Sequence, residues 1–252
     1  MKIGIIGAGQ IGGVLIRQYA IAGHSVKMTN SGGLEKLKNL ALETGASPVS
    51  IDAVVRDVDA IVISIPLMAI AKLPKHLFNN LPDNITIIDT GNYYPIRDGV
   101  IKEIEDGMTE SVWVANQIQR PVIKTYNSIL SRSLVHSGLA RGTASRVALP
   151  IAGDDRKSKE LASTLVNDSG FDSLDCGSLQ DSWKQQPGSP VYCTDLTLIQ
   201  LENSIKKARK GILPARRELG LAYILTHDAE QWMDCVNYNR KIYESDLAGS
   251  KS

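Results

Sequence analysis

The feature that most constrains the fold lies at the start of the chain, where a short apolar run leads directly into three spaced glycines. Residues 3–6 precede Gly7, Gly9 and Gly12 in the spacing G-x-G-x-x-G, and an amphipathic helical pattern begins at Ile11. The spacing alone is a weak signal, but a strand before it and a helix after it are the context of a dinucleotide-binding turn. The sequence therefore predicts such a turn, in preference to a glycine-rich turn without a ligand.

The three glycines have distinct physical roles in a turn of this kind. Gly7 allows the tight exit from the strand, Gly9 lets the backbone approach a pyrophosphate, and Gly12 lets the helix pack close to the sheet. The first helical turn then directs free N–H groups and the positive end of the helix dipole toward the phosphates. We therefore expect the pyrophosphate of a dinucleotide to bind at residues 7–12.

Strand and helix patterns alternate over most of the chain. The continuous apolar runs at 60–65 and 85–88 are typical of strands buried on both faces of a sheet. The alternation predicts an α/β fold with a Rossmann-type, doubly wound, mostly parallel sheet and a binding crevice at the carboxyl ends of its strands. The expected strands are 2–6, 25–28, 60–65, 85–88, 122–126, 147–152 and 171–174, and the expected helices are 11–22, 34–43, 50–56, a segment from 131, and 155–166.

The composition changes near Cys176. Residues 177–194 are rich in Gly, Ser, Gln and Pro, and two helical patterns follow at 195–210 and 217–243. We therefore expect an NAD(P)-binding Rossmann domain over residues 1–178 and a C-terminal helical segment over residues 179–252. The apolar faces of the last helices are expected either to extend the domain or to form a homodimer interface.

Charge and composition argue against several classes of function. The net charge of +1 gives no reason to expect nucleic acid or an anionic membrane as a partner. No apolar run approaches the roughly 20 residues of a membrane span, and the early glycines, Gln10 and Arg17 argue against a signal peptide. Three scattered cysteines fit a reducing compartment, and the four histidines lack metal-ligand spacing. We expect a cytoplasmic protein without a metal site.

The end of the second strand indicates which nicotinamide cofactor binds. An NAD site normally has an acidic residue there that accepts a hydrogen bond from the ribose 2′-hydroxyl. In this chain no acidic residue occurs before Glu35, whereas hydroxyls are present at Thr29 and Ser31 and a cation at Lys36. This pattern favours NADP, with Lys36 as a point charge for the 2′-phosphate. The alternative is a polar turn followed by a solvated lysine.

Six short motifs within residues 1–180 carry a resemblance to a known family. They are 7–12, 29–31 with Lys36, 63–66, 124–127, 152–155 and 174–179. In order and spacing they resemble the NADP-dependent oxidoreductase family named for the deazaflavin coenzyme F420. The resemblance implies that the loop at residues 7–12 holds the pyrophosphate. It also implies that Asn127 lies at the mouth of the site, where the hydride moves. The implied set is Gly7, Ala8, Gly9, Gln10, Ile11, Gly12, Thr29, Asn30, Ser31, Lys36, Ser64, Ile65, Pro66 and Asn127.

The chain departs from this family in two places. Many relatives carry an arginine after the serine, where this chain has Gly32, so a weaker clamp on the 2′-phosphate is expected. The C-terminal segment is longer than in the shortest deazaflavin enzymes. It resembles that of a bacterial subgroup with Asp-Thr-Gly-Asn-Tyr-Tyr-Pro at 89–95 and Trp-Lys-Gln-Gln-Pro-Gly at 183–188.

The sequence shows no obvious acid–base cluster, and no tyrosine has a lysine four residues later. Hydride transfer between a nicotinamide and a flavin-like ring needs little more than orientation, whereas a carbonyl reductase needs a proton donor. The candidate catalytic residues are Asn92, which follows a central strand, Asn127 and His136. Asn92 is also a candidate cofactor-binding residue, because Asn92 and Tyr93 are candidate contacts for the nicotinamide or the acceptor ring. A lysine among 206, 207 and 210 is a candidate for hydroxyacid chemistry.

We therefore expect an NADP(H)-dependent oxidoreductase that transfers hydride between the nicotinamide and a deazaflavin or flavin-like ring, which is a small-molecule partner. One alternative is an NADP-dependent dehydrogenase of a small hydroxy or carbonyl compound. The other is a non-catalytic redox sensor that binds NADP, because a fold does not fix a function.

Overall fold

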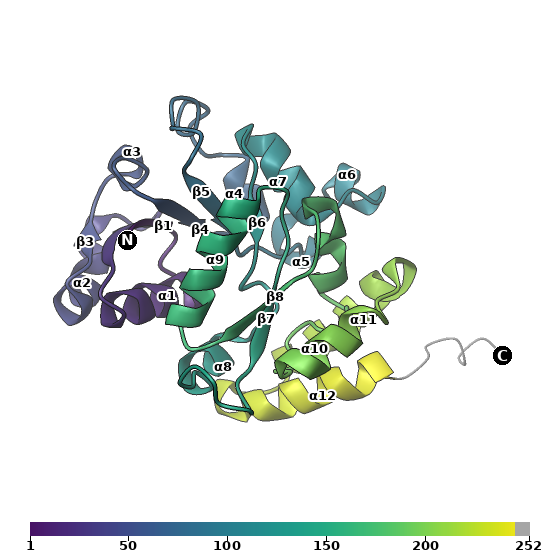
Figure 1. Ribbon diagram of the computed structural model, residues 1–252. Helices are drawn as coiled ribbons and strands as arrows, with labels where there is room; N and C mark the ends of the chain where they lie inside the picture. The colour runs from purple at the N-terminus through teal and green to yellow at the C-terminus, as the bar shows by residue number, and fades with distance from the viewer. Residues whose placement is uncertain (245–252) are drawn as a thin grey trace.

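The computed structural model describes residues 1–244. Its central feature is a six-stranded parallel sheet in the order β3-β2-β1-β4-β5-β6, beside a two-stranded parallel sheet of β7 and β8 (Figure 1). This confirms the predicted Rossmann-type α/β architecture. The strands are β1 Lys2–Ile6, β2 Ser25–Thr29, β3 Ser47–Pro48, β4 Ala60–Ile63, β5 Thr86–Asp89, β6 Ile123–Lys124, β7 Ala148–Ile151 and β8 Asp172–Asp175.

Helices cover both faces of the six-stranded sheet, and α9 crosses in front of its strands in Figure 1. The helices are α1 Gln10–Ile21, α2 Lys38–Thr44, α3 Ile51–Val54, α4 Leu67–Ile70, α5 Pro95–Asp98, α6 Lys102–Glu105, α7 Glu110–Ile118, α8 Ser131–His136, α9 Arg156–Asp168, α10 Leu198–Ile205, α11 Leu213–Leu225 and α12 Trp232–Glu244. Short 3-10 turns are η1 Leu34–Leu37, η2 Leu179–Gln185, η3 Lys210–Ile212 and η4 Ala229–Gln231.

The core consists of two apolar layers separated by the sheet. Successive side chains of a strand point to opposite faces, so Ile5 packs in the layer of α1 and α9, whereas Ile6 packs in the layer of α3, α4 and α7. Every residue of β4 is buried, as is every residue of β5. The apolar runs that predicted these two strands are therefore explained by burial on both faces.

The C-terminal helices differ from the prediction. The single helix expected over 217–243 is two helices, α11 and α12. The break occurs at Asp228, whose side chain and that of Gln231 form a reciprocal capping box before η4. This box satisfies backbone N–H groups that a continuous helix would have bonded internally, so it starts a new helix without Gly or Pro. The prediction of one long helix was wrong for this reason.

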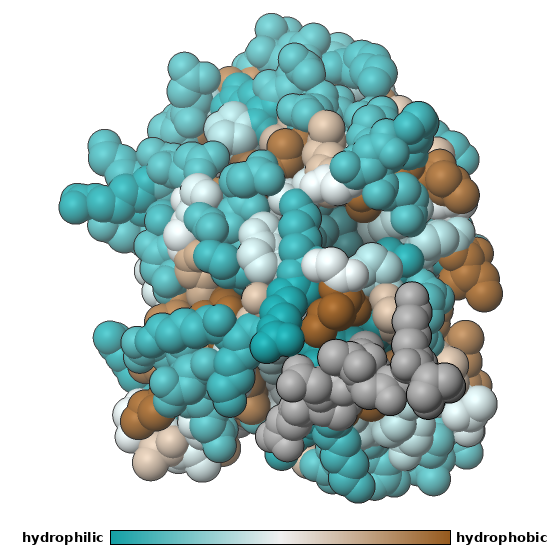
Figure 2. Space-filling model, turned by 90° about the vertical axis from the view of Figure 1, so that its right-hand side faces the viewer, coloured by the Kyte–Doolittle hydropathy of each residue, from teal (hydrophilic) through white to brown (hydrophobic). Residues whose placement is uncertain are grey.

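The segment between β8 and α10 packs into the body of the molecule. The side chain of Gln185 is fully buried, and Thr197 forms an antiparallel bridge with Val147 beside β7. The domain boundary near residue 178 stays a prediction. Seen from the side on which the C-terminal helices lie, the surface is mainly hydrophilic with separate apolar patches (Figure 2). None of the helices within residues 1–244 has the length and apolar character required to span a membrane.

Candidate functional site

A cavity of about 590 Å³ lies at the carboxyl ends of β1, β4, β5 and β6. We call it the crevice cavity. Parallel sheets bind ligands at this edge, where the strand order reverses. Its lining comes from five chain segments and one helix: residues 9–11; 64–66; 90–92, 94, 96 and 97; 126, 127 and 129–131; 192–193; and the Leu221, Ile224 and Leu225 side of α11. The structure thus brings residues 9–11 of the glycine loop together with Ser64, Ile65, Pro66, Asn92 and Asn127.

The glycine loop has room for a ligand at one glycine only. A Cβ atom at Gly12 would lie 1.9 Å from the Gly7 carbonyl oxygen, and one at Gly7 would lie 2.2 Å from the Ser64 oxygen at a φ of +100°. A Cβ at Gly9 would meet nothing within 4 Å. Gly9 is also the N-cap of α1 and offers no side-chain cap to the first N–H groups. The open space and the uncapped helix end fit a pyrophosphate.

The polar turn after β2 has features that fit a 2′-phosphorylated ribose. The Lys36 side chain folds over Gly32, so its Nζ lies 3.3 Å from where a Cβ of residue 32 would be. Its neighbour Glu35 pairs with Lys38 instead. The amine of Lys36 therefore lies beside Gly32, the residue that follows Ser31. Asn30 Oδ1 is buried and has no hydrogen-bond partner within residues 1–244, so it is a spare acceptor for a hydroxyl.

Asn92 and Asn127 form the floor of the crevice cavity. The Asn92 amide donates to the Asn127 carbonyl oxygen at 2.8 Å, and the Asn127 amide donates to Asn92 Oδ1 at 3.0 Å. Asn127 Nδ2 also donates to the Gln185 carbonyl oxygen at 2.8 Å, and Gln185 Nε2 returns a bond to Asn127 Oδ1 at 3.0 Å. These reciprocal bonds fix both amides, so the floor is preorganised before any ligand binds.

A buried ion pair between Lys124 and Asp89 stabilises the loop that carries Asn92. Lys124 Nζ lies 3.0 Å from Asp89 Oδ2, both side chains are fully buried, and the same amine donates to the Gly91 carbonyl oxygen. Ser111 donates to Asp89 Oδ2 at 2.7 Å, and the Gly91 N–H donates to Asp89 Oδ1 at 2.8 Å. The pair thereby holds the loop after β5 in one conformation. Sequence reasoning did not find it, because its members are separated by up to 35 residues.

Two tyrosine hydroxyls meet on the wall of the crevice cavity. The hydroxyls of Tyr94 and Tyr192 are 2.7 Å apart, and Asn92 Nδ2 donates to Tyr192 at 3.2 Å. Burial raises the pKa of both phenols, so both stay protonated. Tyr93, the tyrosine singled out from sequence, instead packs in the apolar layer of α7 and bonds to Gly99 and Ile101. Adjacent side chains of an extended segment point in opposite directions, so Tyr94 faces the cavity.

The wall opposite the glycine loop is largely apolar. Leu221, Ile224 and Leu225 of α11 face the cavity together with Ile129 and Leu130. Arg97 stands at the rim, where its guanidinium is held by Asp98 at 2.8 Å. Sequence reasoning missed α11 as a wall, because this helix begins far along the chain from the strands of the sheet and carries no motif that places it there.

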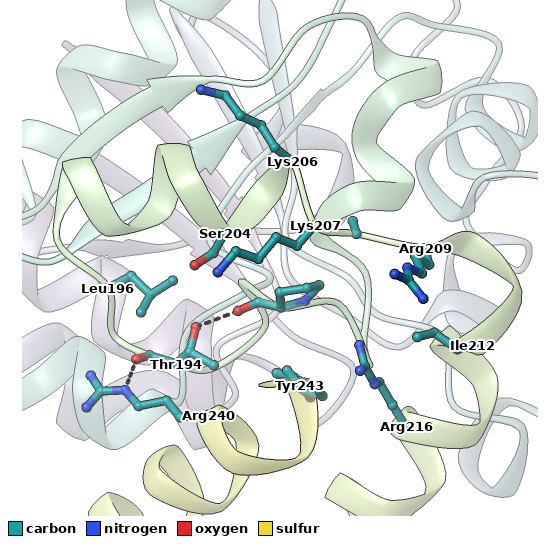
Figure 3. Close-up of a pocket in the computed structure, with 12 residues that line it drawn as sticks. Thr194, Leu196, Ser204, Lys206, Lys207, Arg209, Ile212, Arg216, Arg240 and Tyr243 are labelled. Carbon is teal, nitrogen blue, oxygen red and sulfur yellow. Dashed lines mark hydrogen bonds between the residues drawn. The ribbon is translucent and has the colours of Figure 1, made fainter. Parts of the chain in front are cut away.

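The other candidate residues lie outside the crevice cavity. Lys206 and Lys207 line a separate basic cavity of about 480 Å³, where Lys207 extends toward Ser204 and Thr194 while Lys206 points away (Figure 3). Lys210 donates to the Gly107 carbonyl oxygen at 2.8 Å. His136 stacks on Trp232, with ring centroids 6.2 Å apart. None of these residues is among those that line the crevice cavity within residues 1–244, so the geometry gives no support to their catalytic roles, which stay predictions.

The fold is of the Rossmann type, and the crevice cavity lies at the sheet edge where such folds bind ligands. Residues 2–93 match the family described as NADP oxidoreductase, coenzyme F420-dependent. This confirms the predicted resemblance and supports an NADP-dependent oxidoreductase. The chain is also 40% identical over 76 residues to the Escherichia coli K12 protein YjhV, a match that covers 30% of this chain and 56% of YjhV. The chain thus spans about half the length of that relative.

Two solved structures share the fold. A hypothetical protein, SMa0349 from Sinorhizobium meliloti, aligns with a TM-score of 0.66 and 22% identity over 78% of this chain and 95% of its own. A "putative F420 dependent NADP-reductase" from Arthrobacter sp. FB24 aligns with a TM-score of 0.59 and 20% identity over 72% of this chain and 87% of its own. At these identities the two alignments show the fold alone.

Proposed function

We propose that this protein is an NADP(H)-dependent oxidoreductase that transfers hydride between the nicotinamide and a flavin or deazaflavin ring in the crevice cavity. The observation that carries the proposal is the lining of that cavity. One wall consists of Leu221, Ile224 and Leu225, the floor consists of neutral amides, and no Lys or His is among the lining residues within 1–244. A planar aromatic ring fits such a lining, whereas a small hydroxy acid would lack a Lys or His for proton transfer.

The chain's own residues have defined tasks in this proposal. The backbone at residues 9–11 binds the pyrophosphate, and Ser31 with Lys36 binds the 2′-phosphate. Ser64, Ile65 and Pro66 contact the nicotinamide end, because they line the cavity beside the glycine loop. The bound nicotinamide supplies the hydride chemistry itself. Asn92 and Asn127 hold the two rings in register, and the α11 wall excludes water from them.

The direct test follows NADPH oxidation by stopped-flow absorbance with riboflavin, flavin mononucleotide and a 5-deazaflavin, each corrected for the uncatalysed rate. We expect saturable oxidation with at least one of these acceptors and weaker turnover with NADH. Absence of oxidation with every ring acceptor would overturn the proposal.

A second candidate is reduction of a small carbonyl compound, because the Tyr94 and Tyr192 hydroxyls provide hydrogen-bond donors in the same cavity. Turnover of small aldehydes or ketones, with no turnover of any ring, would favour it. Tight NADPH binding without turnover of any acceptor would instead favour a redox sensor.

We also propose a cytoplasmic homodimer. Ile96 and Leu225 line the crevice cavity yet are 77% and 68% exposed, so a second copy covering them would bury apolar surface. Light scattering after size-exclusion chromatography tests this, and a monomer at micromolar concentration would contradict it.

A further inference from the structure

The tyrosine pair on the crevice wall joins two distant parts of the chain. Tyr94 lies in the loop after β5, and Tyr192 lies in the segment that leads to α10, 98 residues later. Both line the crevice cavity beside Asn92, Leu221 and Ile224. The chain thus brings two phenolic hydroxyls to the part of the cavity that faces the apolar wall of α11, where the acceptor ring is expected.

One phenolic proton of this pair is not used in the hydrogen bond between the two hydroxyls. A tyrosine hydroxyl has one proton and accepts up to two hydrogen bonds. The two hydroxyls together hold two protons, and their mutual bond of 2.7 Å uses one of them. Asn92 is a donor to Tyr192 and consumes no phenolic proton. The second proton therefore remains for another acceptor, whichever tyrosine donates within the pair.

The one competing group within the described chain is the sulfur of Cys193, which interacts with the Tyr192 hydroxyl. Burial raises the pKa of this thiol, so it stays neutral. A neutral thiol is a weak hydrogen-bond acceptor. An oxygen atom of a ligand would displace it readily.

We propose that the Tyr94–Tyr192 pair donates a hydrogen bond to a carbonyl oxygen of the acceptor ring, conjugated with the ring atom that receives the hydride. This inference rests on the proposed function and adds to it a substrate class: ring acceptors that carry such a carbonyl. Asn92 and the partner tyrosine orient the donor, so little reorganisation accompanies the reaction.

The electron and proton balance assigns the pair a donor role without ionisation. A hydride, which carries two electrons, leaves the reduced nicotinamide carbon and forms a bond to the ring atom, so NADPH is oxidised to NADP⁺ and the ring is reduced. The ring double bond at that atom breaks, and its electron pair shifts toward the carbonyl oxygen. The O–H donor stabilises this charge, and solvent supplies the proton that neutralises it. The phenols keep their own protons, because burial disfavours the phenolate.

The experiment compares Tyr94→Phe, Tyr192→Phe and the double variant with two acceptors. Riboflavin carries ring carbonyls, whereas methylene blue is a planar cation without one. With riboflavin we expect each single variant to lose roughly threefold to tenfold in kcat, because the remaining hydroxyl keeps a spare proton. The double variant should lose about 100-fold, the scale of a lost oxyanion donor. With methylene blue, kcat should change less than about threefold in all variants, well below that scale.

A binding measurement gives a readout that does not depend on turnover. A hydrogen bond to the ring carbonyl shifts the absorption band of bound riboflavin to longer wavelength, and this shift should disappear in the double variant. NADPH affinity should stay within about twofold of the wild type, since the cofactor side is intact. Tyr238→Phe is the matched control, because it removes a hydroxyl from α12 at a position outside the crevice cavity.

The outcomes separate the two proposals. If the wild type turns over riboflavin and the double variant does so at the same rate with the same band shift, the inference fails and the proposed function stands. If both acceptors lose rate equally, the tyrosines are structural and the inference fails. If the wild type turns over no ring acceptor, the proposed function fails and the inference fails with it. Should the double variant not fold, an unchanged riboflavin to methylene blue ratio in both single variants overturns the inference.

Discussion

The two sides of the crevice cavity are built in different ways. The cofactor side consists of backbone atoms and glycines from a contiguous motif, and Gly7, Gly9 and Gly12 define it. The acceptor side consists of side chains that are far apart in the sequence, such as Asn92 and Leu225. Some of them are joined by hydrogen bonds, such as that between Tyr94 and Tyr192. The cofactor side depends on the absence of Cβ atoms, whereas the acceptor side depends on buried polar side chains that satisfy one another.

This difference has consequences for how each side tolerates change. A substitution at the open glycine should block a ligand without disturbing the fold. A substitution among the buried amides should disturb the fold, because it leaves partners unsatisfied. Substitutions on the cofactor side are therefore expected to weaken binding, and substitutions on the acceptor side are expected to lower stability.

The largest effect is expected for Gly9→Val. Because a Cβ at residue 9 would meet nothing within 4 Å, the variant should fold normally and place its side chain in the pyrophosphate space. We expect NADPH affinity to fall about 1,000-fold, which corresponds to roughly 4 kcal/mol, with an unchanged melting temperature. Isothermal titration calorimetry and thermal unfolding measure the two quantities.

Gly211→Val is the matched control, because Gly211 is equally open and lies outside the crevice cavity. If Gly9→Val retained the NADPH affinity of the wild type, the cofactor side would not depend on this glycine. The proposed contrast between the two sides would then be wrong.

The next effect concerns Glu110, which lies 3% exposed beneath the acceptor side and near Lys124. Burial raises its pKa from 4.5 to about 7. The folded state therefore holds this proton more tightly than the unfolded state, so the stabilisation is complete below pH 4.5 and is lost as the pH rises through 7. Glu110→Gln stays neutral and avoids this loss.

Urea unfolding at pH 5 and pH 8 measures the effect. The free energy of unfolding of Glu110→Gln, relative to the wild type, should rise by about 2–3 kcal/mol between these pH values. Glu103→Gln, an exposed change on α6, should give no such rise. An equal pH dependence of Glu110→Gln and the wild type would contradict the expected ionisation.

A smaller loss is expected for Gln185→Leu. Gln185 Nε2 donates to Asn127 Oδ1 at 3.0 Å and also reaches the carbonyl oxygens of Lys124 and Pro150. Leucine leaves these buried acceptors without their donor, which should lower the free energy of unfolding by about 2 kcal/mol. The KM for riboflavin should rise, while NADPH affinity should be nearly unchanged. Gln180→Leu, at a position outside the crevice cavity, is the control. Loss of NADPH affinity in Gln185→Leu would show that the two sides are not separable.

The fold around the glycine loop was predicted correctly because its signals are local. A strand, a glycine spacing and a helix occur within residues 2–21, and each follows from backbone geometry. The absence of an acidic residue before Glu35 is equally local, and residues 2–93 also match the family.

The acceptor side could not be predicted in the same way. Tyr192 and Tyr94 are 98 residues apart, and nothing in either segment indicates the other. The choice between Tyr93 and Tyr94 depended on which way one residue of an extended loop faces. By contrast, the capping box of Asp228 and Gln231 was present in the sequence, and it would have divided the last predicted helix correctly.

The smallest of these effects concerns the 2′-phosphate and sharpens the description of the cofactor side. The Lys36 side chain folds over Gly32, the residue that follows Ser31. Ser31→Asp adds a carboxylate that repels the 2′-phosphate and accepts a hydrogen bond from a 2′-hydroxyl. We expect the ratio of NADP to NAD affinity to fall roughly tenfold, equivalent to about 1.4 kcal/mol. Ser31→Asn, which is neutral, should change the ratio far less. An unchanged ratio in Ser31→Asp would mean that a backbone cradle alone, without side-chain charge, selects the cofactor.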